Sequence, residues 1–83
     1  MRSTIIIKKR GNQYISSVSG KFGGGHSGAN AGNTHYDAAA CAAELMIQYA
    51  QSNNEGGDLI APPEVLDLVP ENLHSIKGNN NEN

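Results

Sequence analysis

The chain has 83 residues, a formal net charge of −2, and few large apolar residues: seven Ile, five Leu, three Val and one Phe. This length allows one domain, and a core of this size stabilises a fold by only roughly 3–5 kcal/mol, so a homodimer or an obligate complex is one expected arrangement. A single cysteine, Cys41, excludes an intrachain disulfide and a cysteine-based metal cluster. The apolar run at 5–7 is too short for a signal sequence or a membrane span, so we expect a cytoplasmic protein.

The charges are unevenly distributed along the chain. Residues 1–34 carry five cations and no acid, whereas residues 35–83 carry eight acids and one cation, Lys77. This asymmetry predicts either internal complementarity between the two halves or one basic and one acidic face available to partners, with simple solvated surface charge as the alternative.

Two segments near the N-terminus, 4–9 and 14–18, are rich in β-branched residues and alternate between two faces. The Gly11-Asn12 pair between them supplies the positive φ that a tight turn requires. The sequence therefore predicts a β-hairpin.

The next segment, 20–33, contains six glycines. A third strand could pass through Lys21-Phe22 or near His26-Ser27, because glycine weakens a strand without forbidding it. Otherwise we expect a glycine-rich loop.

One helix is clearly indicated, starting at Thr34. Thr34 is suited to the N-cap position with Asp37 three residues later, and apolar residues at 39, 42, 43, 46 and 50 repeat at helical spacing. The run of alanines favours a helix that packs closely on a sheet. Polar residues at 52–54 and the Gly56-Gly57 pair end it.

The C-terminal third gives a weaker pattern. Residues 58–61 are a short strand candidate, while Glu64–Leu68 suits a short helix after Pro63 or a strand equally well. We expect a single domain over 1–76 with its glycine-rich loop at 20–33, and a disordered Asn-rich tail at 77–83. The predicted class is α+β: a small antiparallel sheet, β-β-(β)-α-β with an extra C-terminal strand or short helix, and one Ala-rich helix on one face.

Catalytic and cofactor patterns are weak. Residues 23–28 match G-x-G-x-x-G, but the helix cap comes six residues later and the chain is too short for a dinucleotide fold. The spacing of His26, His35 and His74 fits no compact metal-ligand pair, and nothing positions a base or an oxyanion hole. We therefore expect a non-enzymatic protein without cofactor or metal.

A binding role is the remaining interpretation. Basic residues cluster near the hairpin turn, and Phe22 is either an apolar anchor or part of the core. The candidate partner-binding residues are Lys8, Lys9, Arg10, Lys21, Phe22, His26, Asp58 and Glu64. A basic hairpin with nearby aromatic rings also makes direct nucleic-acid binding an alternative to a protein partner.

Two families resemble this sequence. The hairpin, the loop and the helix start Thr34-x-x-Asp37-Ala38-Ala39, over residues 4–50, look like the HicB-type antitoxin half-fold. That resemblance implies a β-β-β-α-β domain that seals a toxin, often as an oligomer.

The second resemblance runs nearly end to end. The Gly11-Asn12 hairpin, the Ala-rich helix and the ending at 65–73 are similar to a small type I-F anti-CRISPR protein, and the ending is the most specific piece. This resemblance implies a phage or mobile-element inhibitor that binds a Cas subunit of the surveillance complex in a bacterial host.

Overall fold

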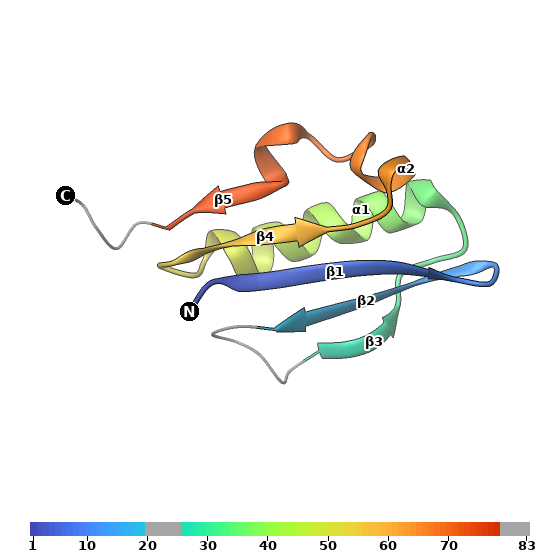
Figure 1. Cartoon of the computed structure of the whole chain (residues 1–83), viewed down its shortest axis with the longest axis horizontal. Coiled ribbons are helices and arrows are strands. Elements are labelled where there is room, and N and C mark those ends of the chain that lie inside the picture. Colours follow the sequence, from blue (N-terminus) through green and yellow to red (C-terminus); the bar gives the residue numbers. More distant parts are fainter. Residues whose placement is uncertain (20–25, 79–83) are drawn as a thin grey trace.

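The predicted hairpin is confirmed and lies in the middle of a five-stranded sheet (Figure 1). The computed structural model describes residues 1–19 and 26–78 of the chain. Strands β1 (Ser3–Arg10) and β2 (Gln13–Ser19) pair antiparallel from Arg10↔Gln13 to Thr4↔Ser19. Gly11 in the connecting turn has a φ of 61°, which glycine adopts without a steric penalty.

A third strand, β3 (His26–Asn30), pairs antiparallel with β2 at the edge of the sheet. It occupies the second of the two positions considered for it, and it runs through the centre of the glycine-rich segment. The candidate residues Lys21 and Phe22 lie outside the described residues.

Helix α1 (His35–Leu45) begins as the sequence predicts, because the side chain of Thr34 accepts a hydrogen bond from the backbone N–H of Asp37 at 3.1 Å. It continues without a break into a π-helical turn, η1 (Met46–Gln51), which the periodicity does not indicate. Met46 and Ala50 point from this wider turn into the core, while Ile47 is exposed.

Strand β4 (Gly56–Ile60) pairs with β1 in parallel, from Ser3↔Gly57 to Ile6↔Ile60. The α+β class and the single helix layer on one face are confirmed, but the sheet is mixed, with the order β3-β2-β1-β4-β5, rather than wholly antiparallel. The reason is the helix: it carries the chain back along the length of the sheet, so β4 enters from the same end as β1.

Of the two structures considered for Glu64–Leu68, the chain adopts the short helix, and the extra C-terminal strand lies further along the chain. Pro63–Leu66 forms the short helix α2, with proline at its first position, and Glu71–Leu73 forms the 3₁₀ turn η2. Strand β5 (Ser75–Lys77) then pairs antiparallel with β4, so Lys77 ends a strand and does not belong to a tail.

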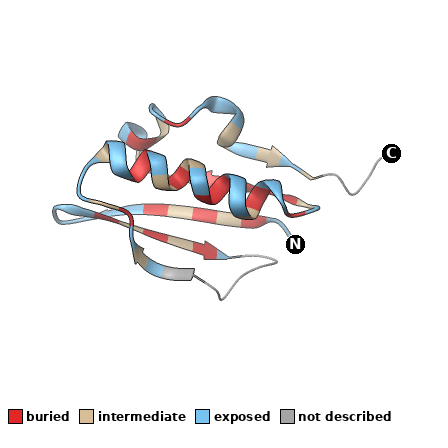
Figure 2. Cartoon of the chain, turned by 180° about the vertical axis from the view of Figure 1, so that it is seen from behind, coloured by how far each residue is buried: buried red, intermediate tan, exposed pale blue. Residues whose placement is uncertain are grey.

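The core lies between the sheet and α1 (Figure 2). Alternate residues of the hairpin point into it, as the period of two requires, and they meet the small side chains of the helix. Its buried hydrophobic residues are Ile5, Ile7, Tyr14, Val18, Ala31, Ala38, Ala39, Ala42, Leu45, Met46, Ala50, Leu59, Val65 and Val69.

Candidate functional site

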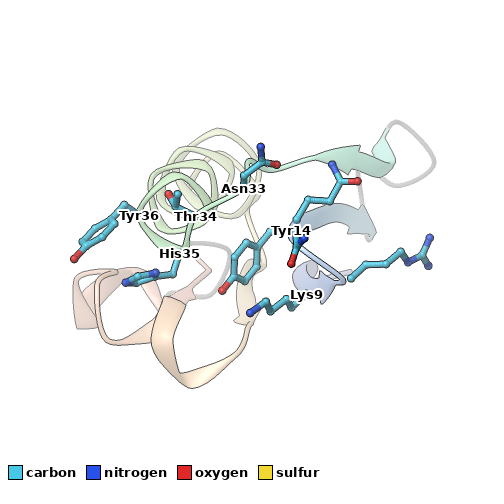
Figure 3. Close-up of a pocket in the computed structure, with 9 residues that line it drawn as sticks. Lys9, Tyr14, Asn33, Thr34, His35 and Tyr36 are labelled. Atoms are coloured by element: carbon cyan, nitrogen blue, oxygen red, sulfur yellow. The ribbon is translucent and has the colours of Figure 1, made fainter.

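A groove of about 770 Å³ opens at the end of the molecule where the hairpin turn meets the start of α1 (Figure 3). The hairpin contributes Lys9, Arg10, Asn12, Gln13 and Tyr14. The segment that leads into the helix contributes Asn33, Thr34, His35 and Tyr36. We call this the basic groove, since Lys9 and Arg10 are its formally charged lining residues.

Two backbone hydrogen bonds bring these distant segments together. The Tyr14 N–H donates to the Gly32 carbonyl at 2.8 Å, and the Ala31 N–H donates to the Tyr14 carbonyl at 2.8 Å. They extend the pairing of β2 past the end of β3, so residues 31–33 run beside the hairpin before the helix begins. The groove is thus built on a hydrogen-bonded sheet margin and a capped helix.

Tyr14 lies at the centre of the groove, between Lys9 and His35 (Figure 3). Its ring is almost fully buried, and its hydroxyl donates to Glu64 Oε2 at 3.0 Å. Lys9 Nζ lies 5.9 Å from the centre of the Tyr14 ring, within reach of a cation–π interaction. Tyr14 therefore joins the hairpin to the start of α2.

The surroundings of Tyr14 and Glu64 keep these two groups in their usual charge states. Burial raises the pKa of Tyr14, and the bond to Glu64 raises it further, so the phenol stays protonated. A hydrogen bond from its own backbone N–H lowers the pKa of Glu64, helped by the Tyr14 hydroxyl and by the charges of Lys9 and His35. Glu64 is consequently a carboxylate that offsets part of the positive charge beside the groove.

The rim of the groove carries a pair of rings, of which Tyr36 is exposed and His35 is half-buried. The His35 and Tyr36 ring centroids are 4.2 Å apart with an interplanar angle of 34°, and Tyr36 is 65% exposed. The Thr34 hydroxyl is held in place at the rim, because its oxygen accepts the capping hydrogen bond from the Asp37 N–H.

The structure brings together three of the eight candidate residues named from the sequence: Lys9 and Arg10 line the groove, and Glu64 lies next to it. Lys8 points to the other face of β1 by the alternation of the strand, in register with Ile15. The remaining candidates are elsewhere or undescribed: the side chain of His26, like Lys21 and Phe22, lies outside the described residues.

Asp58 has a structural partner. Arg2 donates to both of its carboxylate oxygens, at 2.8 and 3.1 Å, and the Ser75 hydroxyl donates at 2.7 Å. The bonds from Arg2 and Ser75 lower the pKa of Asp58. This cluster ties the N-terminus to β4 and β5, at the opposite end of β1 from the groove.

The sequence did not single out Asn33, His35 and Tyr36 as binding residues, and His35 was interpreted as structural or exposed. Their position immediately before and within the first turn of α1 was visible, but their proximity to the hairpin turn depends on the path of residues 31–33.

A second surface lies on the sheet face that the described helices leave uncovered (Figures 1 and 2). Ile6 pairs with Ile60 on β4 and lies diagonal to Ile15 on β2. Ile60 is 55% exposed, and the other two are half-buried by their neighbours in the sheet. We call these three residues the isoleucine face. Ser17, Thr4 and Lys8 border it.

Metal binding and thiol chemistry find no support in the described part of the chain. Among residues 1–19 and 26–78, no three His, Cys, Asp or Glu side chains are grouped so that they could hold a metal ion. Partial burial raises the pKa of Cys41, so its reactive thiolate form is disfavoured at neutral pH.

Within residues 1–19 and 26–78, no helix is both long and apolar enough to cross a membrane.

Comparisons with known proteins give no assignment: no protein-family model matches the chain, and no curated protein is significantly similar to it.

Proposed function

We propose that this chain is a non-enzymatic phage or mobile-element inhibitor that binds a Cas subunit of a type I CRISPR surveillance complex and blocks interference. The isoleucine face carries this proposal. An apolar centre with a polar rim is the usual arrangement of a protein–protein contact surface, and Ser17, Thr4 and Lys8 provide such a rim here. A partner docked there would cover the exposed side chain of Ile60.

The class of partner comes from the resemblance of residues 65–73 to a type I-F anti-CRISPR protein. In the structure, Val65 and Val69 of that ending are buried, and Leu66 and Leu73 pack against the core. The resemblance therefore concerns residues that stabilise the fold. The contact surface has to be sought among exposed residues, and the isoleucine face is the apolar surface that the sheet presents.

Binding of the purified chain to a purified type I surveillance complex tests the proposal, measured by biolayer interferometry before and after nuclease treatment. We compare Ile60→Lys with Ile47→Lys, since Ile47 is 50% exposed but belongs to the helical layer on the other side of the sheet. Ile60→Lys is expected to weaken binding at least tenfold, because it places a charge in an apolar contact, and Ile47→Lys less than twofold. The proposal fails if the complex does not bind the chain, or if both variants bind equally.

An antitoxin role is the second candidate, and one observation favours it. From β1 to β4, with η1 continuing α1, the elements follow the order β-β-β-α-β, which the resemblance to the HicB-type half-fold implies. Under this alternative the chain binds one toxin. Co-expression with the product of an adjacent gene, scored by growth, would show protection by the chain; absence of a toxic neighbour contradicts it.

A further inference from the structure

The basic groove combines positive charge, ring faces and amide groups, and we propose that it binds a single strand of nucleic acid. This surface is separate from the isoleucine face, so the inference goes beyond the docking of a protein partner. It rests on the lining residues of the groove and on the electrostatics beside it.

Positive charge is the first requirement of such a site, because phosphates dominate the affinity for nucleic acid. Lys9 and Arg10 are both exposed and both line the groove, so their charged groups are accessible to phosphate oxygens. Lys9 lies on the helix side of β1 over the Tyr14 ring, whereas strand alternation places Arg10 on the same side as Lys8, at the outer margin of the groove. Two cations match about two phosphates. For a single strand this predicts a slope of log K against log salt of about −1.4.

Exposed rings are the second requirement. Tyr36 and His35 form a tilted pair at the rim, and most of the Tyr36 ring is open to solvent. An aromatic ring that contributes so little to the core is available as a platform on which a base can stack. Stacking of this kind accepts any base, since every base has a flat face.

Amide side chains supply the third element. Asn12, Gln13 and Asn33 line the groove, and each can both donate and accept hydrogen bonds. Base edges also present hydrogen-bond donors and acceptors side by side, whereas the side chains of an acidic peptide are carboxylates, which only accept. The mixture of amides with rings therefore favours a nucleic-acid strand over an acidic protein segment.

Glu64 determines which form of nucleic acid fits. Its carboxylate, held by the Tyr14 hydroxyl, faces Lys9 and His35 and would repel a second row of phosphates. A duplex presents one charge per roughly 1.7 Å of its axis and needs a larger basic surface than two cations provide. A single strand can place its phosphates along Lys9 and Arg10 and turn its bases toward the rings.

Fluorescence anisotropy of the full chain with labelled ten-nucleotide RNA and DNA single strands of the same sequence tests the inference, in 50 and 200 mM salt. Lys9→Glu is compared with Lys8→Glu, which changes the net charge equally but lies on the other face of β1. We expect Lys9→Glu to lower affinity at least tenfold and Lys8→Glu less than threefold. Tyr36→Ala should lower affinity about fivefold or more, and Glu64→Gln should raise it.

Circular dichroism of each variant verifies that the fold is retained, and all four positions are on the surface. Equal losses for Lys9→Glu and Lys8→Glu would show attraction by net charge only and would overturn the inference, as would the absence of binding in 50 mM salt. A stronger affinity for RNA than for DNA would support a contact to the 2′-hydroxyl within the same site. If the chain binds the surveillance complex but neither the RNA nor the DNA strand, the inference fails while the proposed function stands. If the chain binds a strand but not the surveillance complex, the inference stands while the proposed function fails.

Discussion

Replacing Asn53 by alanine should destabilise the fold more than any change at the surface. Asn53 is only 2% exposed and follows the π-helical turn. Its Nδ2 group donates to the Met1 carbonyl at 2.8 Å, to Ser3 Oγ at 2.9 Å and to the Gly56 carbonyl at 3.1 Å. Its Oδ1 accepts from the Glu55 N–H at 3.1 Å. One side chain thus joins the end of the helix to the first residues of β1 and β4.

The expected loss of stability follows from the polar groups that Asn53→Ala leaves without a hydrogen-bond partner. Ser3 and Gly56 are buried, so the Ser3 hydroxyl and the Gly56 carbonyl lose a donor that water cannot readily replace. A buried polar group left unsatisfied costs about 1–3 kcal/mol, and two such groups give a loss of about 2–6 kcal/mol. For a domain of this size, at about 4–8 °C per kcal/mol, that corresponds to a fall in Tm of roughly 8–48 °C.

Thermal and urea unfolding followed by circular dichroism measure this loss. Asn54→Ala is the matched control, because it removes the same amide from the next residue, which is exposed. A free energy of unfolding for Asn53→Ala within about 1 kcal/mol of the control would refute the reasoning. It would mean that the neighbouring polar groups find other partners at little cost.

Two further predictions concern packing and pH. Gly57→Ala should cost about 1–3 kcal/mol in urea unfolding, because a Cβ there would lie 2.7 Å from the Ser3 carbonyl oxygen and 2.7 Å from the Ala50 Cβ; an unchanged midpoint would contradict it. The pKa values of Asp58 and Glu64 are lower in the folded chain than in the unfolded one, so their contribution to stability is complete above the unfolded pKa and is lost as pH falls through the folded pKa. The urea concentration at the unfolding midpoint should therefore decrease as the pH is lowered below about 4. The double variant Asp58→Asn, Glu64→Gln should show a smaller decrease. An equal pH dependence in the two proteins would contradict a stabilising role of these carboxylates.

Local patterns predicted the elements that local rules control. Alternation along the two segments correctly separated Ile5 and Ile7 from Ile6, and the structure shows that the face of Ile5 and Ile7 is the buried one. The Thr34 cap was predicted from residue type and spacing, and the structure shows its hydrogen bond to Asp37. These features depend on neighbours within a few residues, so they can be inferred from the sequence alone.

Features that depend on distant partners were not predictable in this way. The parallel pairing of β4 with β1 is decided by the direction in which the helix returns the chain, and the π-helical turn by how Met46 and Ala50 reach the core. The groove likewise requires residues 31–33 to run beside the hairpin. Among the candidate residues, charge alone grouped Lys8 with Lys9, although strand alternation separates them.

The two ends of β1 have different roles, and this separation makes the functional tests interpretable. At its start, the Asn53 cluster holds the N-terminus, the helix end and β4 together; at its end, Lys9 and Arg10 line the groove. Eight residues of strand span about 23 Å at roughly 3.3 Å per residue, well beyond the distance at which substitutions normally couple. Lys9→Glu removes the cation–π contact with Tyr14 and places a second carboxylate near Glu64, so it should lower the unfolding midpoint slightly and far less than Asn53→Ala does. Asn53→Ala should reduce strand binding only in proportion to the unfolded fraction. A double variant whose effects did not add would show that the groove and the fold are coupled through β1.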